Sequence, residues 1–228
     1  MKSVIFYNLY PKNHWKELTL FLLSHVPYDT IVVNVTLDKF DKIFRKKAIE
    51  RFLKKIPKVT EIYFTDNSAY GEVPGFDRMR KSTDLSDYSI LTYLHSKGVT
   101  KPDNKNITDW IKLMHYFLTD KFDLCKEVFL KKYVLYGVNL SNEEDWIKNS
   151  YYGPNQFSRF HYSGNFVSVN LEMVRDKFIN TPIDLDYFGV EGFFGKLCLY
   201  EQAYPAHLSS KIIQNHYKEP YPELYYKE

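Results

Sequence analysis

The chain has 228 residues, 44% of them hydrophobic, so it is long enough to bury the core of one large domain. Its 31 basic and 28 acidic residues are spread along the chain and leave a formal charge of +3. This balance falls short of the concentrated basic patch that non-specific nucleic-acid binding requires. Cys125 and Cys198 lie in apolar stretches that look helical, and two thiols form neither a metal cluster nor a disulfide framework.

No apolar run approaches the roughly 20 residues that a membrane-spanning helix needs. Met1-Lys2 is followed by a strand-like run that is too short for the core of a signal peptide. We therefore expect a cytoplasmic protein with no membrane span and no nucleic-acid partner.

Strand-like runs alternate with helical periodicity through the first half of the chain. Strands are predicted at residues 4–7, 30–35, 61–65 and 89–94. The first three precede predicted helices at residues 15–22, 40–52 and 76–85. The helix at 40–52 carries one apolar stripe, and Pro57 ends this helix. The stripe consists of Phe40, Ile43, Phe44, Ala48 and Phe52.

The clearest amphipathic helix follows the fourth predicted strand. Asn106 or Thr108 is its predicted cap, and its apolar face consists of Trp110, Leu113, Met114, Phe117 and Leu118. Two further strands are predicted at residues 133–139 and 165–169. The polar, tyrosine-rich segment between them, residues 142–159, has a length typical of a functional loop.

Strands that alternate with helices predict an α/β, Rossmann-type fold, with a central mostly parallel sheet flanked by helices on both faces. Ligands bind such sheets at the carboxyl ends of the strands. Polar residues follow three predicted strands: Tyr7 and Asn8 after the first, Asp66 and Asn67 after the third, and His95-Ser96-Lys97-Gly98 after the fourth.

The residues after the fourth strand suit a diphosphate. Lys97 supplies a positive charge, while Ser96 and backbone N–H groups near Gly98 supply directed hydrogen bonds. An ordinary solvated turn, in which Gly98 only permits a positive φ, explains the same residues equally well.

Residues 93–99, Tyr-Leu-His-Ser-Lys-Gly-Val, resemble the YLHTKGV signature of a group of bacterial and large-virus glycosyltransferase-like proteins. Residues 161–166, His-Tyr-Ser-Gly-Asn-Phe, are similar to the HYSGNF motif of that group, although Val167-Ser168 replaces its usual tryptophan pair. Residues 71–72 and 109–117 resemble further motifs in the same order. The resemblance spans roughly residues 60–200.

The resemblance implies a GT-A-like fold in a single glycosyltransferase domain at residues 1–216. Its nucleotide-binding half would cover about residues 1–100, and its sugar and acceptor half about residues 101–216. The implied donor is a nucleoside-diphosphate sugar, a UDP-sugar by analogy, and the implied acceptor is a glycan or glycolipid. Residues 217–228 are rich in Pro, Tyr and charge and are predicted to be a tail or linker, which leaves open that the chain is one domain of a larger multidomain protein.

Glu191 opens a predicted helix near Val190, at the position where the family carries an acidic residue. We predict that it is the catalytic base, which takes the proton from the acceptor hydroxyl. The alternative is an exposed first-turn glutamate that the helix macrodipole favours. The predicted donor-binding residues are Tyr7, Asn8, Asp66, Asn67, Glu72, Asp77, His95, Ser96, Lys97, Gly98, His161, Ser163, Gly164 and Asn165.

Many GT-A enzymes hold the diphosphate through a divalent cation on an Asp-x-Asp motif, and residues 95–97 stand at that place without carboxylates. Manganese or magnesium is nevertheless a candidate cofactor, with Asp77, Asp184 and Asp186 as candidate ligands. Asp184-Leu185-Asp186 is an Asp-x-Asp tripeptide, but about one is expected by chance among 15 aspartates. A polar loop that caps the following helix is its alternative explanation.

Two other functions compete with glycosyl transfer. A sugar-nucleotide pyrophosphorylase usually carries a glycine-rich phosphate loop straight after the first strand, where this chain has Asn8-Leu9-Tyr10-Pro11. A non-catalytic module that binds nucleotide sugars or carbohydrates differs from the transferase only by the absence of turnover.

Overall fold

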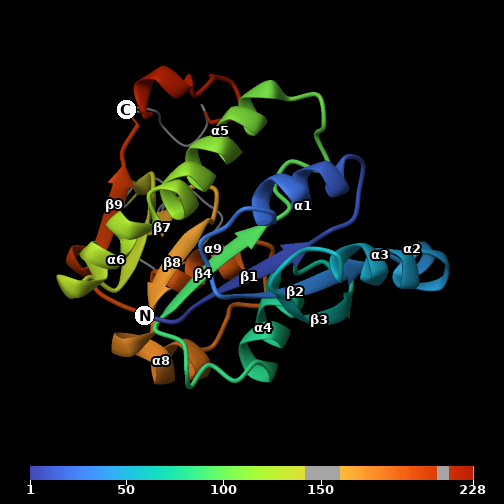
Figure 1. Cartoon of the computed structure of the whole chain (residues 1–228), viewed down its shortest axis with the longest axis horizontal. Helices are drawn as coiled ribbons and strands as arrows, with labels where there is room; N and C mark the ends of the chain where they lie inside the picture. Colours follow the sequence, from blue (N-terminus) through green and yellow to red (C-terminus); the bar gives the residue numbers. More distant parts are fainter. Residues whose placement is uncertain (142–159, 210–215, 228) are drawn as a thin grey trace.

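The computed structural model describes residues 1–141, 160–209 and 216–227, so the predicted functional loop at 142–159 lies outside the described residues. A seven-stranded sheet with the order β3-β2-β1-β4-β8-β5-β9 forms the centre of the protein (Figure 1). The strands are β1 (Ser3–Leu9), β2 (Thr30–Leu37), β3 (Val59–Asp66), β4 (Ile90–His95), β5 (Leu135–Val138), β8 (Val167–Asn170) and β9 (Ala203–His207).

All strand pairs in this sheet are parallel except those of β8, which runs antiparallel to both β4 and β5. The predicted mostly parallel sheet is therefore confirmed. Two short strands, β6 (Leu140–Ser141) and β7 (His161–Tyr162), form a separate antiparallel pair that the sequence did not predict.

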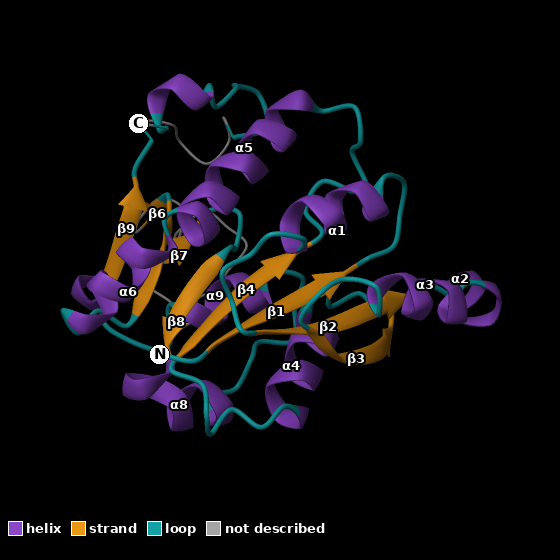
Figure 2. Cartoon of the chain, in the orientation of Figure 1, coloured by secondary structure: helices purple, strands orange, loops and turns teal. Residues whose placement is uncertain are grey.

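Helices cover both faces of the sheet, as predicted (Figure 2). One face packs against α1 (Trp15–Leu23), α3 (Lys46–Leu53), α5 (Lys105–His115) and α6 (Phe122–Leu130). The other face packs against α4 (Val73–Ser82), α8 (Leu171–Asn180) and α9 (Gly189–Phe194). The other elements in the described residues are α2 (Lys39–Phe44), a π-helical turn (Tyr116–Asp120) and two 3-10 turns (Tyr200–Gln202 and Glu223–Tyr225).

Strand β1 is buried along its whole length, as expected for a central strand with helices on both sides. Its side chains alternate between the two layers of the core. Ile5, Tyr7 and Leu9 belong to one layer, and Val4 and Phe6 belong to the other. This alternation also decides which residues at the end of the strand face a ligand.

The predicted helix at residues 40–52 is two helices, α2 and α3, which are separated at Arg45, where φ is −117° and ψ is −14°. Its single apolar stripe was also a wrong prediction. Phe40, Ile43 and Phe44 are 63%, 72% and 68% exposed, and only the α3 part of the segment contributes to the core.

Three local predictions are also corrected by the structure. Helix α5 is capped by Asn104, whose side chain accepts hydrogen bonds from the backbone N–H groups of Asn106 and Ile107. Cys125 lies in α6 as predicted, but Cys198 lies in the bend after α9. Residues 217–228 were predicted to be a tail or linker, but Tyr221 and Tyr226 of this segment are buried against the domain.

In the part of the chain that the structure describes, no helix combines the length and the apolar character needed to cross a bilayer.

Gly75 brings α4 into close contact with the polar ends of β1 and β2. A Cβ atom at Gly75 would lie 2.3 Å from Asn34 Nδ2 and 2.5 Å from Asn8 Oδ1. We expect Gly75→Ala to lower the free energy of unfolding by about 1–3 kcal/mol, measured by urea denaturation, because overpacking displaces both amides. Ser82→Ala changes an exposed residue of the same helix and is the control. Equal stability of the two variants would contradict this close packing.

Candidate functional site

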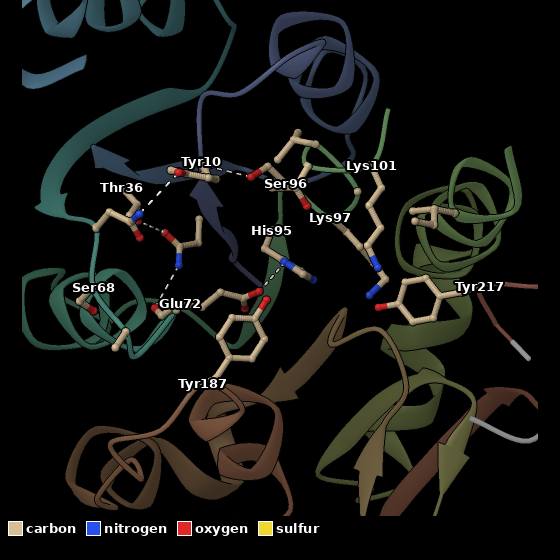
Figure 3. Close-up of a pocket in the computed structure, with 18 residues that line it drawn as sticks. Tyr10, Thr36, Ser68, Glu72, His95, Ser96, Lys97, Lys101, Tyr187 and Tyr217 are labelled. Carbon is tan, nitrogen blue, oxygen red and sulfur yellow. Dashed lines mark hydrogen bonds and ion pairs between the residues drawn. The ribbon is translucent and has the colours of Figure 1, made fainter. Parts of the chain in front are cut away.

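A pocket of about 490 Å³ opens at the carboxyl ends of β1, β2, β3 and β4 (Figure 3). Strands β2 and β3 lie on one side of β1, and β4 lies on the other. Connections therefore leave in opposite directions at β1 and β4, which is the point where open α/β sheets bind ligands. The pocket is lined by Asn8, Tyr10, Thr36, Asn67, Ser68, Ala69, Gly71, Glu72, His95, Ser96, Lys97, Gly98, Val99, Thr100, Lys101, Ile107, Tyr187 and Tyr217.

A buried network of amides and hydroxyls forms one side of this pocket. Asn34 Nδ2 donates to Asn8 Oδ1 at 3.0 Å and to Thr65 Oγ1 at 2.9 Å. Asn8 Nδ2 donates in turn to the backbone carbonyl of Glu72 at 3.0 Å, which links β1 to the start of α4. The network holds Asn8 in a single orientation, because both ends of its side-chain amide are hydrogen-bonded.

Glu72 and His95 form an ion pair at the centre of the site. His95 Nδ1 lies 2.6 Å from Glu72 Oε1, and His95 Nε2 lies 3.0 Å from the carbonyl oxygen of Gly164. Tyr93 and Asn165 donate to Glu72 Oε2 at 2.7 and 3.2 Å. Both ring nitrogens of His95 thus face oxygen atoms, Glu72 Oε1 and the carbonyl oxygen of Gly164, which fix the orientation of the ring.

Burial acts to raise the pKa of Glu72, but other groups outweigh it. The charge and hydrogen bond of His95, the hydroxyl of Tyr93 and the charge of Lys97 hold that pKa below its ordinary value. Glu72 is therefore a well-stabilised carboxylate. It suits the positioning of neighbouring groups better than the acceptance of a proton.

Lys97 extends between two aromatic rings. Its Nζ lies 4.1 Å from the ring centroid of Trp110 and 5.6 Å from that of Tyr217. Burial lowers the pKa of Lys97, and the negative charges of Glu191 and Glu72 partly offset that effect. The side chain thus places a positive charge at the wall of the pocket, opposite the Glu72–His95 pair (Figure 3).

Glu191 lies in the first turn of α9, behind the pocket wall rather than among the lining residues. Burial raises its pKa to about 6, with Lys97 acting in the opposite direction and Glu72 acting in the same one. The carboxylate also accepts a hydrogen bond from the backbone of Gly164. A carboxylate with such a pKa is a competent proton acceptor near neutral pH.

Two glycines shape the walls through close packing against α5. Gly98 has φ +81°, and a Cβ there would lie 2.6 Å from Ile107 Cγ2. Gly164 has φ +94°, and a Cβ there would lie 2.5 Å from Met114 Sδ and 2.9 Å from Trp110 Cζ2. The positive φ that the sequence suggested for Gly98 is present, so this glycine meets a steric requirement whether or not it contacts a ligand.

The structure brings most of the predicted donor-site residues together. Those at the pocket surface are Asn8, Asn67, Glu72, His95, Ser96, Lys97 and Gly98. Gly164 and Asn165 lie directly behind them, through their contacts with His95 and Glu72.

Other predicted donor-site residues lie elsewhere. Tyr7 is buried in the core, where its hydroxyl shares a 3.0 Å hydrogen bond with Thr19, so it does not reach the pocket. Asp66 points to the surface and pairs with Lys42 at 2.8 Å. His161 and Ser163 are 3% and 4% exposed.

The side chain of His161 belongs to the interior of the protein. Burial, and secondarily the charge of His216, lower the pKa of His161 to about 3. Its Nε2 lies 3.4 Å from Ser163 Oγ. A buried neutral imidazole of this kind contributes to packing around β7, and direct contact with a sugar in the pocket is not supported.

The candidate metal ligands are engaged with other groups. Asp184 pairs with Lys196 at 2.6 Å, and Asp186 Oδ1 accepts from the N–H of Phe188 at the start of α9. Asp77 pairs with Arg80 and Lys81 on its own helix. Within residues 1–141, 160–209 and 216–227, no group of three or more His, Cys, Asp or Glu side chains is placed to hold a metal ion. Asp77, Asp184 and Asp186 thus each have other partners in the structure.

Other lining residues were not predicted as site residues, among them Tyr10, Thr36, Tyr187 and Tyr217. Thr36 lies at the end of β2, where the same rule that identified Asn8 and His95 would have found it. Tyr10 hydrogen-bonds to Asp38 at 3.0 Å, and its backbone N–H donates to Ser96 Oγ at 2.7 Å. No local pattern marks Tyr187 or Tyr217, because only tertiary packing brings them to the pocket.

Comparison with known proteins leaves the sequence resemblance untested. No family model matches the chain, and no curated protein matches it. One similar solved structure is 4-diphosphocytidyl-2C-methyl-D-erythritol synthase from Anaerococcus prevotii DSM 20548. It shares 14% identity over 92% of this chain and 91% of that chain, with a TM-score of 0.43. A likeness this distant carries no argument about activity.

Proposed function

We propose that this chain is a glycosyltransferase that transfers a sugar from a nucleoside-diphosphate sugar to a hydroxyl group of a glycan or glycolipid. The observation that carries the proposal is one arrangement: Lys97 and the Glu72–His95 pair line the pocket at the switch point of the sheet, with the Glu191 carboxylate directly behind them. The resemblance of residues 93–99 and 161–166 supports a UDP-sugar as the donor.

The pocket offers suitable groups for each part of such a donor. Its volume of about 490 Å³ lies in the range of small-molecule sites, roughly 300–1,000 Å³. Tyr10 presents an aromatic ring for the base, and Asn67 offers an amide to the ribose. Lys97 would neutralise the diphosphate as a point charge. Glu72 and Asn165 would orient the sugar hydroxyls.

Transfer with inversion needs a base and a stabilised leaving group. The acceptor oxygen forms a bond to the anomeric carbon while the bond from that carbon to the phosphate oxygen breaks. The electron pair leaves with the nucleoside diphosphate, and the acceptor proton passes to Glu191. The positive charge of Lys97 stabilises the negative charge that develops on the leaving group.

The opposite pKa shifts of the two glutamates assign their roles. Glu191, with its pKa raised to about 6, accepts a proton more readily than Glu72, whose pKa is lowered. Pairs of carboxylates whose environments separate their pKa values commonly divide the work of a site in this way. Glu72 would then position His95, while Glu191 acts as the base.

The turn after β1 argues against a nucleotidyltransferase or pyrophosphorylase reaction. The backbone N–H of Tyr10, which such an enzyme would direct at a phosphate, already donates to Ser96 Oγ at 2.7 Å. A non-catalytic binding module would use the same pocket as the transferase, so only turnover separates these two functions.

The proposal is tested by a thermal-shift panel of UDP-, GDP-, CDP- and dTDP-sugars, each with and without manganese. A ligand that binds only the folded state at 100 times its Kd adds about 2.7 kcal/mol of stability. We expect one class of nucleotide sugar to raise Tm. When an acceptor is added to that donor, we expect the protein to release the free nucleoside diphosphate. Failure of every nucleotide sugar to shift Tm would contradict a donor site, while a shift without turnover would indicate a binding module.

A further inference from the structure

Helix α2 carries an exposed apolar surface at the end of the molecule farthest from β9 (Figure 1). Phe40, Ile43 and Phe44, named here the apolar patch, are 63%, 72% and 68% exposed. They stand at positions i, i+3 and i+4, so they share one face of the helix. The rings of Phe40 and Phe44 lie 4.8 Å apart. Three large apolar side chains on six residues of helix form a cluster rather than scattered surface residues.

Positive charge is concentrated around this patch. Residues 39–58 contain nine Lys or Arg and two Asp or Glu, a net charge of +7, although the whole chain carries only +3. The rest of the chain is therefore net negative, and the apparently even spread of charge does not hold for the α2–α3 segment. Lys39, Lys42, Lys46 and Lys47 are all exposed and lie within about two turns of the apolar patch.

We propose that the apolar patch and the lysines around it dock the protein on an anionic membrane surface. A basic, aromatic-bearing amphipathic segment binds in the interface plane, with its apolar side chains in the headgroup region and its cations near anionic lipid headgroups. The combination favours a bilayer over a nucleic acid, because Ile43 has no aromatic face on which a base can stack.

The docking surface lies next to the pocket. Asp38 immediately precedes α2, and its carboxylate accepts hydrogen bonds from Tyr10 at 3.0 Å and from Asn67 at 2.9 Å. Both donors line the pocket. A bilayer bound at α2 would therefore lie beside the pocket mouth. If the proposed transferase function holds, this position favours a lipid-borne acceptor, but docking itself does not depend on that function.

Vesicle co-sedimentation of the full chain tests the docking surface. We expect binding to vesicles of phosphatidylcholine with phosphatidylglycerol, and little binding to phosphatidylcholine alone. The triple variant Phe40→Ser, Ile43→Ser, Phe44→Ser should weaken binding by roughly tenfold or more. Lys39→Gln with Lys47→Gln should also weaken it, and rising salt should reduce binding of the wild type. Leu130→Ser with Leu199→Ser, at positions 66% and 70% exposed elsewhere, is the matched control and should bind like the wild type.

Several outcomes would overturn the proposal. One is equal vesicle binding by the wild type and the triple variant. Another is that the wild type does not bind anionic vesicles but binds RNA or DNA through the same lysines. A third is loss of self-association in the triple variant without any vesicle binding, which would assign the patch to a second copy of the chain. A cooperative thermal unfolding transition, measured for each variant, verifies that the variants compared are folded. Since vesicle binding is measured without donor or acceptor, failure of the proposed sugar transfer would leave this result unchanged.

Discussion

Glu191→Gln is expected to lower the turnover number by roughly 10²–10⁴-fold while leaving the affinity for the donor nearly unchanged. The amide keeps the shape of the side chain but cannot take the acceptor proton. Steady-state kinetics together with calorimetric titration of the donor separate these two effects. Glu172→Gln is the matched control, because Glu172 also lies in the first turn of a helix, α8, and is exposed.

The pH dependence gives an independent test of the same residue. With a pKa of about 6 in the free enzyme, Glu191 must lose its proton to act, so kcat/KM should rise with pH through about 6. Full turnover in Glu191→Gln, or a profile that is flat across this range, would show that another group is the base. Equal decreases of the turnover number in Glu191→Gln and Glu172→Gln would indicate a general effect of the charge at a helix N-terminus.

Stability should change in the opposite direction to activity. The folded state raises the pKa of Glu191 from its ordinary value of 4.5 to about 6, so it favours the protonated carboxyl. That stabilising contribution is present below about pH 4.5 and is lost as pH rises through about 6. Glu191→Gln, which keeps a neutral side chain, should therefore be more stable than the wild type by about 1–2 kcal/mol above pH 7, and similar to it near pH 4. Urea denaturation at both pH values measures the difference.

Lys97→Met is expected to weaken donor binding by roughly 10–100-fold, because the diphosphate loses a charge-assisted partner worth about 1.5–3 kcal/mol. Methionine retains an unbranched apolar side chain that packs against Trp110. Calorimetric titration with the donor identified by the thermal-shift panel measures the loss. The control is Lys105→Met, which removes an exposed cation from the first turn of α5.

A comparison of ligands localises the effect of Lys97. The free nucleoside lacks the diphosphate, so wild type and Lys97→Met should bind it with similar affinity. A loss of nucleoside affinity as large as the loss for the nucleotide sugar would contradict the placement of the diphosphate at Lys97. Unchanged affinity for both ligands would remove Lys97 from the site.

The sequence predicted the part of the site that follows from the geometry of parallel strands. Asn8 and His95 were found because the ends of adjacent parallel strands meet at one edge of the sheet, and in the structure they are paired residues of β1 and β4. The prediction that Tyr7 contacts the donor was wrong for a related reason. Strand β1 continues to Leu9, and the alternation of side chains sends Tyr7 into the core and Asn8 to the pocket.

Two of the missed residues, Tyr187 and Tyr217, depend on long-range packing. Tyr187 and Tyr217 reach the pocket from the loop before α9 and from the C-terminal segment, and neither lies at a strand end. Only the second half of the motif at 161–166 identified residues of the site. The turn places Gly164 beside His95 and Asn165 beside Glu72. His161, in the first half, belongs to β7. The apolar stripe of residues 40–52 failed because periodicity shows that side chains share a face but does not show what covers it.

The C-terminal segment has a consequence for when the site becomes complete during protein synthesis. Asn104 and Asn106 both donate hydrogen bonds to the carbonyl oxygen of Tyr217, whose ring lies beside Lys97 and Lys101. Tyr217, which forms the pocket wall beside Lys97, is therefore translated more than a hundred residues after β4. A nascent chain can pair β1 to β4 early, but it acquires a finished pocket only after residues 216–227 have left the ribosome and docked.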